Sequence, residues 1–263
     1  MTLERFIGVK YRRDEDKIAR LRELLEEIGI EGARVIEERV DLQFDALKNL
    51  RENLEDDELF IKLVIANAVV SYQLSGKGEA WWWEFSRHFS ENPPEGSIWK
   101  AYADFLPRSR TNRRLVAGKV KRLQRLEPFL EPLDLNALGE YYLAGMGRLR
   151  DDIAEALNSK RSAKTIVFAV KMFGYAGRIA FGEFVPYPME IEIPDDVRIN
   201  AYTKRFTNEP PVSFWAGIAE ETKIPPLHID SILWPALGGN EEVKKRLKGN
   251  CKKWELVLEL VEL

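Results

Sequence analysis

Apolar residues recur every three or four positions along most of the chain, which is the period of an amphipathic α-helix. The repeat is clearest at Ile36, Val40, Phe44, Leu47, Leu50 and Leu54. The same period predicts further helices over residues 61–69, 116–126 (ending before Pro128), 135–157 (as one or two helices), 162–180, 195–206, 213–222, 226–237 and 241–261. Strand-like alternation is confined to residues 184–193, whose prolines favour an extended loop. The pattern therefore predicts an all-α fold.

Two turn-rich stretches interrupt the helical pattern, from Pro93 to Gly96 and from Pro107 to Asn112. They predict an N-terminal helical layer over residues 1–110 and a central layer over residues 111–206. The helices of residues 207–263 could pack on either layer. We expect two helical subdomains flanking a cleft, because such a cleft is a common place for a ligand.

The composition allows a sizeable core, since 45% of the 263 residues are hydrophobic. Cys251 is the only cysteine, so an internal disulfide and a cysteine-ligated iron–sulfur cluster are excluded, and a reducing cytoplasm is expected. With only two histidines, a zinc site is also disfavoured. The chain opens without a signal-peptide pattern, and the apolar stretch of residues 60–72 is too short to span a bilayer. We expect no metal, cofactor or membrane.

The formal net charge of −3 does not by itself indicate a nucleic-acid partner, but the basic residues are clustered. Eight Lys and Arg residues with no acid lie between Arg108 and Arg125, and a second basic run extends from Lys244 to Lys253. Local surfaces of this kind can bind phosphates on a mildly acidic protein. The alternative is that both runs are ordinary solvated helix faces.

The segment that follows Ser162 places four unusual side chains on one helix face. Lys164, Phe168, Lys171 and Tyr175 stand at i, i+4, i+7 and i+11, opposite an apolar stripe. In solvent this face would expose Phe168, and in a core it would bury unpaired lysines. A cleft that holds a flat ligand resolves the conflict, with Phe168 stacked on the ligand. Otherwise Phe168 packs in the core while both lysines reach solvent.

A candidate carboxylate follows at Asp196, in the run Pro194-Asp195-Asp196-Val197-Arg198. An amine can attack C1′ of a sugar and form a Schiff base, while a nearby carboxylate stabilises the positive charge that develops. Lys164 and Asp196 could form such a pair and remove a damaged base from DNA. The polar connection of residues 158–161 would join two helices as a hairpin that holds a DNA phosphate, with Lys164 one turn into the second helix.

Other side chains admit two interpretations each. Gln43, at the edge of an apolar stripe, either caps a neighbouring helix or reads the edge of a base. The three tryptophans of residues 81–83 cannot all point one way on a helix, so we expect at least one to be partly exposed or to line a cleft. The alternative is that they pack in an aromatic core. Asp230 and Trp234 share a helix face as an i, i+4 pair, either as a cap and a core residue or as part of a site.

Three segments together resemble the archaeal 8-oxoguanine DNA glycosylase family, AGOG, a divergent branch of the helix-hairpin-helix glycosylase superfamily. They are Lys164 to Met172, Pro194 to Arg198 and Pro225 to Trp234. The resemblance covers most of the chain and implies a helix-hairpin-helix fold that acts on DNA containing 8-oxoguanine. It implies Lys164 as the Schiff-base nucleophile and Asp196 as the catalytic carboxylate. For the pocket that binds the oxidised base, it implies Gln43, Trp81, Phe168, Lys171, Asp230 and Trp234.

The expected activity is therefore base excision followed by β-lyase strand cleavage, with no organic cofactor, no metal and no obligate protein partner, in the cytoplasm of a prokaryote. The hairpin departs from the superfamily in one respect, because residues 158–163 lack its two usual glycines. This departure puts the hairpin-bound metal ion of some superfamily members in doubt. The alternatives are a non-catalytic helical module that binds DNA or RNA, and a protein-interaction scaffold with the tryptophans at its surface.

Overall fold

The computed structural model describes residues 11–263, and residues 1–10, where no signal-peptide pattern is expected, lie outside this part. The described chain consists of α-helices joined by loops, a short 3-10 helix at Leu106–Arg108, and one isolated bridge between Arg13 and Thr207. The predicted all-α class is confirmed. The helices are α1 (Glu15–Arg39), α2 (Leu42–Leu54), α3 (Asp57–Val69), α4 (Gly78–Glu91), α5 (Ile98–Phe105), α6 (Val116–Leu130), α7 (Leu135–Ala144), α8 (Met146–Ala156), α9 (Lys164–Phe181), α10 (Val197–Thr203), α11 (Pro211–Thr222), α12 (Pro226–Leu237), α13 (Glu241–Asn250) and α14 (Trp254–Glu262).

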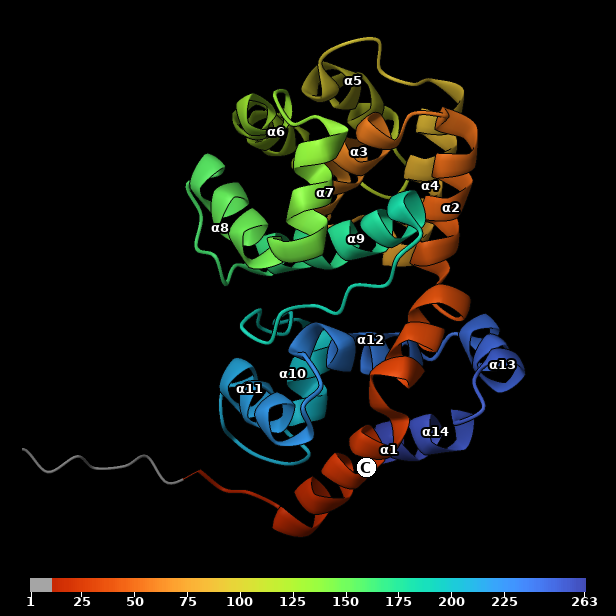
Figure 1. Ribbon diagram of the computed structural model, residues 1–263, viewed down its shortest axis with the longest axis vertical. Helices are drawn as coiled ribbons and strands as arrows, with labels where there is room; N and C mark the ends of the chain where they lie inside the picture. Colours follow the sequence, from red (N-terminus) through yellow and green to blue (C-terminus); the bar gives the residue numbers. More distant parts are fainter. Residues whose placement is uncertain (1–10) are drawn as a thin grey trace, which may run out of the picture.

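Two hydrophobic cores divide the helices into an upper and a lower layer (Figure 1). The upper core is formed mainly by α2 to α9, and the lower core by α1 with α10 to α14. The extended segment 182–196 passes from one layer to the other. This division differs from the expected boundaries near residues 110 and 206, because α1 joins the C-terminal helices. Hydrophobic periodicity shows which face of a helix is buried, but it does not show which helices share a core.

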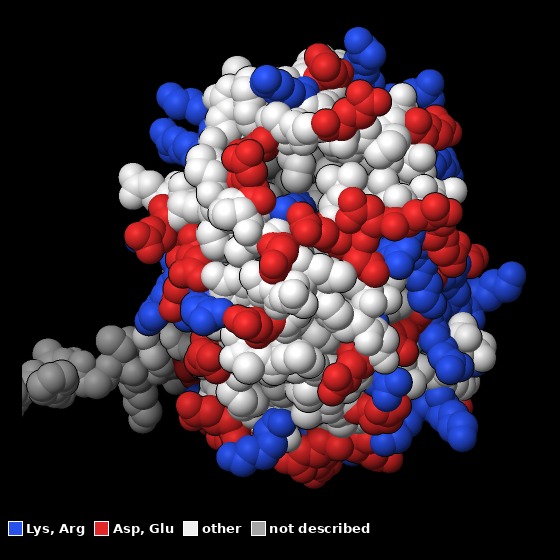
Figure 2. Space-filling view, turned by 45° about the horizontal axis from the view of Figure 1, so that its top comes forward, with Lys and Arg blue, Asp and Glu red and all other residues white. Residues whose placement is uncertain are grey.

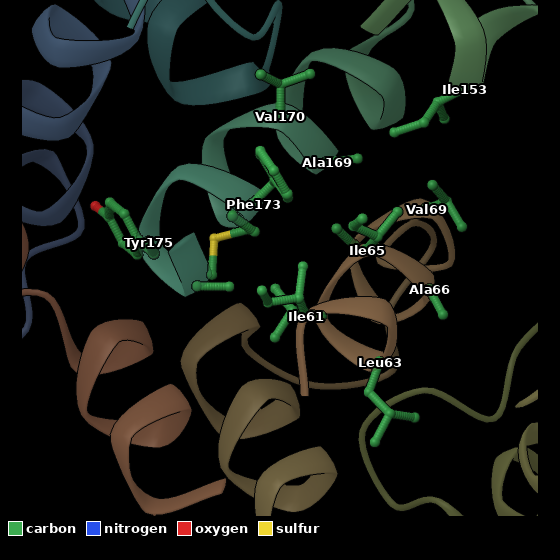
Figure 3. Packing of buried hydrophobic residues seen from close by; sticks show 14 of the residues in the cluster. Ile61, Leu63, Ile65, Ala66, Val69, Ile153, Ala169, Val170, Phe173 and Tyr175 are labelled. Carbon is green, nitrogen blue, oxygen red and sulfur yellow. The ribbon is translucent and has the colours of Figure 1, made fainter. Parts of the chain in front are cut away.

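Helices α3 and α9 pack against each other at the centre of the upper core (Figure 3). Helix α3 is buried on every side from Phe60 to Val69, which explains its almost continuous apolar sequence. Two glycines allow close approach to α9. A methyl group at Gly174 would lie 2.3 Å from the ring of Tyr187, and one at Gly177 would lie 2.2 Å from the ring of Tyr142. The crossing segment and α7 are thereby able to pack tightly on α9.

Some helix boundaries differ from those expected. Helix α6 does not end before Pro128 but continues to Leu130, so the proline removes one backbone hydrogen bond from the last turn of the helix. The single helix expected over residues 241–261 is two helices, because the chain turns after Gly249-Asn250, residue types that often end helices. The segment 135–157 forms α7 and α8, which meet at Gly145.

The expected helix-hairpin-helix consists of α8, the connection of residues 157–163, and α9. Lys164 is the first residue of α9 and not one turn inside it, because Ala163 already has the extended backbone of an N-cap residue. Helix α9 lies on the underside of the upper layer, and α12 lies on top of the lower layer (Figure 1). Side chains of these two helices meet across the junction, as the ion pair between Lys171 and Asp230 shows.

Charged side chains are unevenly distributed over the surface. Figure 2 shows acidic side chains across the middle of one face, with Lys and Arg mainly toward its edges. Most of the basic run around α6 is exposed, although Lys119 is buried and Arg122 is half-buried. Within residues 11–263, no helix combines the length and apolar character needed to cross a membrane.

Candidate active site

A pocket opens between the two layers, with walls from α2, α4, α9, α12 and the segment that precedes α10. Its cavity has a volume of about 170 Å³. An engineered apolar cavity of about 150 Å³ holds benzene, so a planar ring system fits this space with part of it toward the opening. The lining residues are Gln43, Ser71, Leu74, Gly78, Trp82, Lys164, Phe168, Lys171, Pro194, Asp196, Asp230 and Trp234.

Lys164 and Asp196 meet at this pocket, with 3.9 Å between Lys164 Nζ and Asp196 Oδ2. The lysine side chain is 51% exposed and the aspartate side chain is 11% exposed, so the amine lies at the opening and the carboxylate lies inside. The separation is longer than a hydrogen bond, which leaves the amine able to reach a substrate atom beside the carboxylate.

The Asp196 carboxylate is fixed by two further contacts. Its Oδ1 accepts a hydrogen bond from the Ile199 backbone N–H at 2.9 Å, as the N-cap of α10, and its Oδ2 accepts one from Trp234 Nε1 at 2.9 Å. The neighbouring Asp195 is exposed and accepts a hydrogen bond from the Asn200 side chain instead. The structure therefore brings Asp196, and not Asp195, to Lys164.

Lys171 and Asp230 form a buried ion pair deeper in the pocket, with 2.6 Å between Lys171 Nζ and Asp230 Oδ2. Burial raises the pKa of Asp230, although the charge of Lys171 opposes this shift. Burial alone would lower the pKa of Lys171, but the charges of Asp230 and Asp41 raise it overall. Asp230 Oδ1 is buried without a hydrogen-bond partner among the described residues. An acceptor left in this state is costly unless a ligand donates to it.

Gln43 lies in the first turn of α2, where it is 3% exposed and lines the pocket. Asp41, the N-cap of α2, accepts hydrogen bonds from the Gln43 backbone N–H at 2.9 Å and from the Tyr175 hydroxyl at 3.1 Å. Burial raises the pKa of Asp41 to about 6, against the opposing charge of Lys171. The N-cap of α2 thus fixes the backbone at Gln43 and ties it to α9.

Phe168, Trp82 and Trp234 supply aromatic walls to the pocket. Phe168 is half-buried, and its ring meets the Trp82 ring edge-on with 6.0 Å between the centroids. The Arg198 guanidinium lies over the Trp234 ring, with Cζ 4.2 Å from the centroid, so it holds the indole in place. Each ring is therefore supported by another side chain before any ligand arrives.

The structure places Trp82, and not the expected Trp81, at the pocket. Trp81 is fully buried, stacks on Phe105 with 5.5 Å between ring centroids, and donates its indole N–H to Ser71 Oγ at 2.8 Å. Trp81, Phe85 and Phe89 recur every four residues as the core stripe of α4, whereas Trp82 lies at the edge of that stripe. The phase of the helix is the signal that favours Trp82.

Comparison with known proteins decides the family. The model of the AGOG family, described as N-glycosylase/DNA lyase, matches residues 22–261. The chain belongs to the AGOG family. Curated relatives named N-glycosylase/DNA lyase include one from Thermococcus kodakarensis, 72% identical over 263 residues and covering 100% of both chains. Another, from Methanococcus maripaludis, is 46% identical over 95% of this chain and 100% of its own length.

A solved structure agrees with this AGOG assignment. The chain is similar to Pa-AGOG, the 8-oxoguanine DNA glycosylase from Pyrobaculum aerophilum, whose crystal structure is a complex with 8-oxoguanosine. The TM-score is 0.77 and the identity is 27%, with 94% of this chain and 96% of that chain covered. The predicted family and the helical glycosylase fold are confirmed, as is the bifunctional class of N-glycosylase and DNA lyase.

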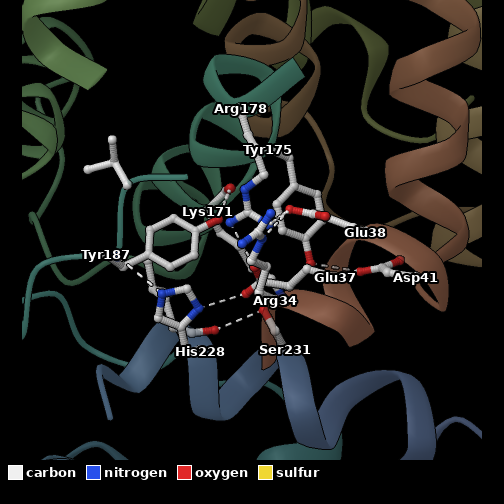
Figure 4. Close-up of polar contacts among 12 residues, drawn as sticks. Arg34, Glu37, Glu38, Asp41, Lys171, Tyr175, Arg178, Tyr187, His228 and Ser231 are labelled. Atoms are coloured by element: carbon white, nitrogen blue, oxygen red, sulfur yellow. Dashed lines mark hydrogen bonds and ion pairs between the residues drawn. The ribbon is translucent and has the colours of Figure 1, made fainter. Parts of the chain in front are cut away.

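A buried polar network lies beside the pocket of this AGOG protein (Figure 4). Glu37 of α1 is fully buried and accepts a hydrogen bond from Arg178 Nη2 of α9 at 2.8 Å. The Tyr187 backbone N–H donates to His228 Nε2 at 3.3 Å, so His228 Nδ1 carries the proton that it donates to Glu37 Oε1 at 2.8 Å. Tyr187 also donates its hydroxyl to the Lys171 carbonyl at 2.6 Å. The network therefore links both layers to the backbone at Lys171.

Four of the residues that line the pocket are not among the site residues expected from the sequence: Ser71, Leu74, Gly78 and Pro194. Gly78 is the most informative, because a methyl group there would lie 3.6 Å from Trp234 Cη2 and 3.8 Å from Gln43 Nε2. Small and apolar loop residues carry no chemical signature in a sequence, so only their position identifies them. Within residues 11–263, no group of three or more His, Cys, Asp or Glu residues is placed to hold a metal ion.

Proposed function

We propose that this chain excises 8-oxoguanine from DNA with Lys164 as the nucleophile and Asp196 as the catalytic carboxylate. The observation that carries the proposal is the 3.9 Å separation of Lys164 Nζ and Asp196 Oδ2 at the opening of a pocket sized for a planar ring. The damaged nucleotide leaves the base stack and enters the pocket. Its sugar then lies at the opening, within reach of Lys164.

The chemistry follows from these positions. The Lys164 amine forms a bond to C1′ while the bond from C1′ to the base breaks, and the base leaves with the electron pair. The Asp196 carboxylate stabilises the positive charge that develops on the sugar and helps to activate the amine. Opening of the sugar ring gives a Schiff base. Loss of a C2′ proton then breaks the bond from C3′ to the phosphate oxygen, which cleaves the strand 3′ to the lesion.

Recognition of the base rests on the deeper part of the pocket. 8-Oxoguanine differs from guanine by the oxygen at C8 and by a hydrogen on N7, so selection requires an acceptor for that hydrogen. Asp230 Oδ1 lacks a partner among the described residues, and the Gln43 amide lines the same pocket. Either side chain supplies an acceptor, while Phe168 and Trp234 supply rings against which a base can stack. Pa-AGOG was solved in complex with 8-oxoguanosine, which supports 8-oxoguanine as the base that the pocket takes.

Borohydride trapping on a duplex that contains 8-oxoguanine tests the proposal. The parent protein is expected to give a covalent complex, whereas Lys164→Gln gives neither complex nor base release while its thermal unfolding stays close to that of the parent. Lys204→Gln, at an exposed lysine that lies outside both the pocket and the hairpin, is the matched control and should trap normally. A covalent complex with Lys164→Gln would contradict the assignment and make Lys171 the next residue to test. A parent that binds the duplex but never traps would support the alternative of a non-catalytic nucleic-acid-binding module.

A further inference from the structure

Leu115 has a conformation and an exposure that the fold does not explain. It is the residue before α6, it has the left-handed backbone (φ 55°, ψ 34°), and its side chain makes no capping hydrogen bond. It is also 60% exposed. Glycine or asparagine would take this backbone at lower cost, and an exposed leucine adds nothing to either core. A strained and exposed apolar side chain is a reason to look for a ligand.

The loop that presents Leu115 is held firmly. The Glu84 carboxylate accepts hydrogen bonds from the backbone N–H groups of Arg110 at 2.7 Å and Thr111 at 3.0 Å. The Asn112 side chain is buried, donates to the Val70 carbonyl at 3.2 Å and accepts from the Lys119 amine. The loop that carries Leu115 is therefore held in place by hydrogen bonds.

The same loop is joined to the segments around the pocket. The Thr111 carbonyl accepts a hydrogen bond from the Ser75 backbone N–H at 2.8 Å, and Ser75 directly follows Leu74 in the pocket wall. Further along α6, Arg122 Nη2 donates to Thr165 Oγ1 at 2.8 Å, beside Lys164. Arg122 lies about 10 Å along the helix axis from Leu115. Leu115 thus projects from a unit that is anchored at the pocket wall and beside the nucleophile.

Charge distinguishes Leu115 from the other exposed apolar residues. The neighbouring Arg110, Arg113 and Arg114 are exposed, and none of them forms an ion pair within residues 11–263. Val197 is 84% exposed but follows Asp195 and Asp196, whose charges repel phosphate. Guanidinium groups beside an exposed leucine suit a DNA duplex, because the phosphates attract the cations and a leucine can enter between base steps.

We propose that Leu115 inserts into the duplex at the position left by the flipped nucleotide, while Arg113 and Arg114 contact the flanking phosphates. Extrusion of a nucleotide leaves its neighbours unstacked, and an apolar side chain in the gap slows the return of the base. The strained backbone directs the side chain outward before DNA arrives, so no reordering is needed on binding. The proposal rests on the glycosylase activity and not on the identity of the damaged base.

The test compares Leu115→Gly with Leu143→Gly, at another leucine that is 55% exposed and lies outside the loop. Glycine suits the backbone at residue 115, so the fold should be kept or stabilised. We expect Leu115→Gly to slow single-turnover excision from a duplex about tenfold or more. In the inactive Lys164→Gln background, it should also abolish the fluorescence increase of a 2-aminopurine placed next to the lesion. Leu115→Met should restore most of both signals.

Matching rates and fluorescence for the two glycine variants would overturn the proposal. A slower rate with unchanged fluorescence would overturn it as well, because Leu115 would then act after the base has left the stack. If the parent protein itself releases no 8-oxoguanine, the proposed substrate is wrong, but the proposed role of Leu115 is not contradicted. A duplex with an abasic site, the substrate of the lyase step, then replaces the lesion duplex in the same comparison.

Discussion

Replacement of Asp196 by asparagine separates the chemical role of this carboxylate from its structural role. Asparagine is as good an N-cap residue as aspartate, so its amide oxygen can keep the hydrogen bond from Ile199 N–H, which is 2.9 Å long in the parent. The amide NH₂ then faces the Trp234 indole N–H, and two donors meet where the parent has a 2.9 Å hydrogen bond. The loss of that bond should cost about 1 kcal/mol of stability.

The loss of negative charge should weigh more heavily on the reaction. Asp196 Oδ2 lies 3.9 Å from Lys164 Nζ, and the sugar cation forms next to that amine. At about 4 Å, two unit charges attract by roughly 4 kcal/mol at an effective dielectric constant of about 20, and by about 1 kcal/mol in water. Asp196 is only 11% exposed, which favours the upper part of this range. A loss of about 3 kcal/mol in the transition state corresponds to a rate reduced by roughly a hundredfold or more.

The assay is single-turnover base excision at saturating enzyme, with duplex affinity and thermal unfolding measured on the same samples. Asp196→Asn should slow excision while affinity changes little, because the charge acts only as the sugar becomes cationic. Asp195→Asn is the control, since Asp195 is exposed and contacts Asn200. Equal losses in affinity and rate would refute the electrostatic argument, and slow excision by Asp195→Asn alone would show that the neighbouring carboxylate is catalytic.

Substitutions at three further positions test the pocket and the residues that support it. Gly78→Ala should leave excision near the parent level, because a methyl group fits 3.6 Å from Trp234, whereas Gly78→Leu should block base entry without lowering thermal stability. Phe168→Ala should weaken binding of a flipped base by about 1–3 kcal/mol, measured as duplex affinity with and without the lesion. Asp41→Asn should be more stable than the parent by about 1–3 kcal/mol above pH 6, because burial raises the pKa of Asp41 to about 6. The folded parent keeps a proton that the unfolded chain loses near pH 4, so its stability falls between these values. The advantage of the variant in denaturant unfolding should therefore shrink as pH falls from 6 to 4 and should be absent below pH 4.

The sequence predicted the helices and most of the pocket because each depends on local information. The period of apolar residues places Lys164, Phe168 and Lys171 on one face of α9, and all three line the pocket in the structure. Lys171 is buried on this face but is paired with Asp230, so no unpaired lysine is buried there. Asp230 lies on another helix, and no local pattern could predict that pairing.

Other features could not be predicted because they depend on how distant segments pack. The association of α1 with α10 to α14 follows from the lower core, which no periodicity reveals. The phase of α4 places Trp81 on the core stripe, but the pocket that Trp82 lines is completed by α9 and α12, which are distant in the sequence. The cap at Asp41 matters because Tyr175 of α9 donates to it, and the glycine at residue 78 matters because it lies beside Trp234 of α12.

The position of the site between two cores explains why the junction contains buried charges. Glu37 and His228 are hydrogen-bonded to each other within the lower layer, and Arg178 of the upper layer donates to Glu37 across the junction (Figure 4). A shift of one layer against the other would leave charged groups buried without partners, which costs about 3–5 kcal/mol when a single partner is removed. Apolar contacts tolerate such a shift far better, because they have no preferred direction. The network therefore holds α9 and α12 in one register, and the separation of Lys164 from the Asp196 carboxylate, which Trp234 anchors to α12, depends on that register.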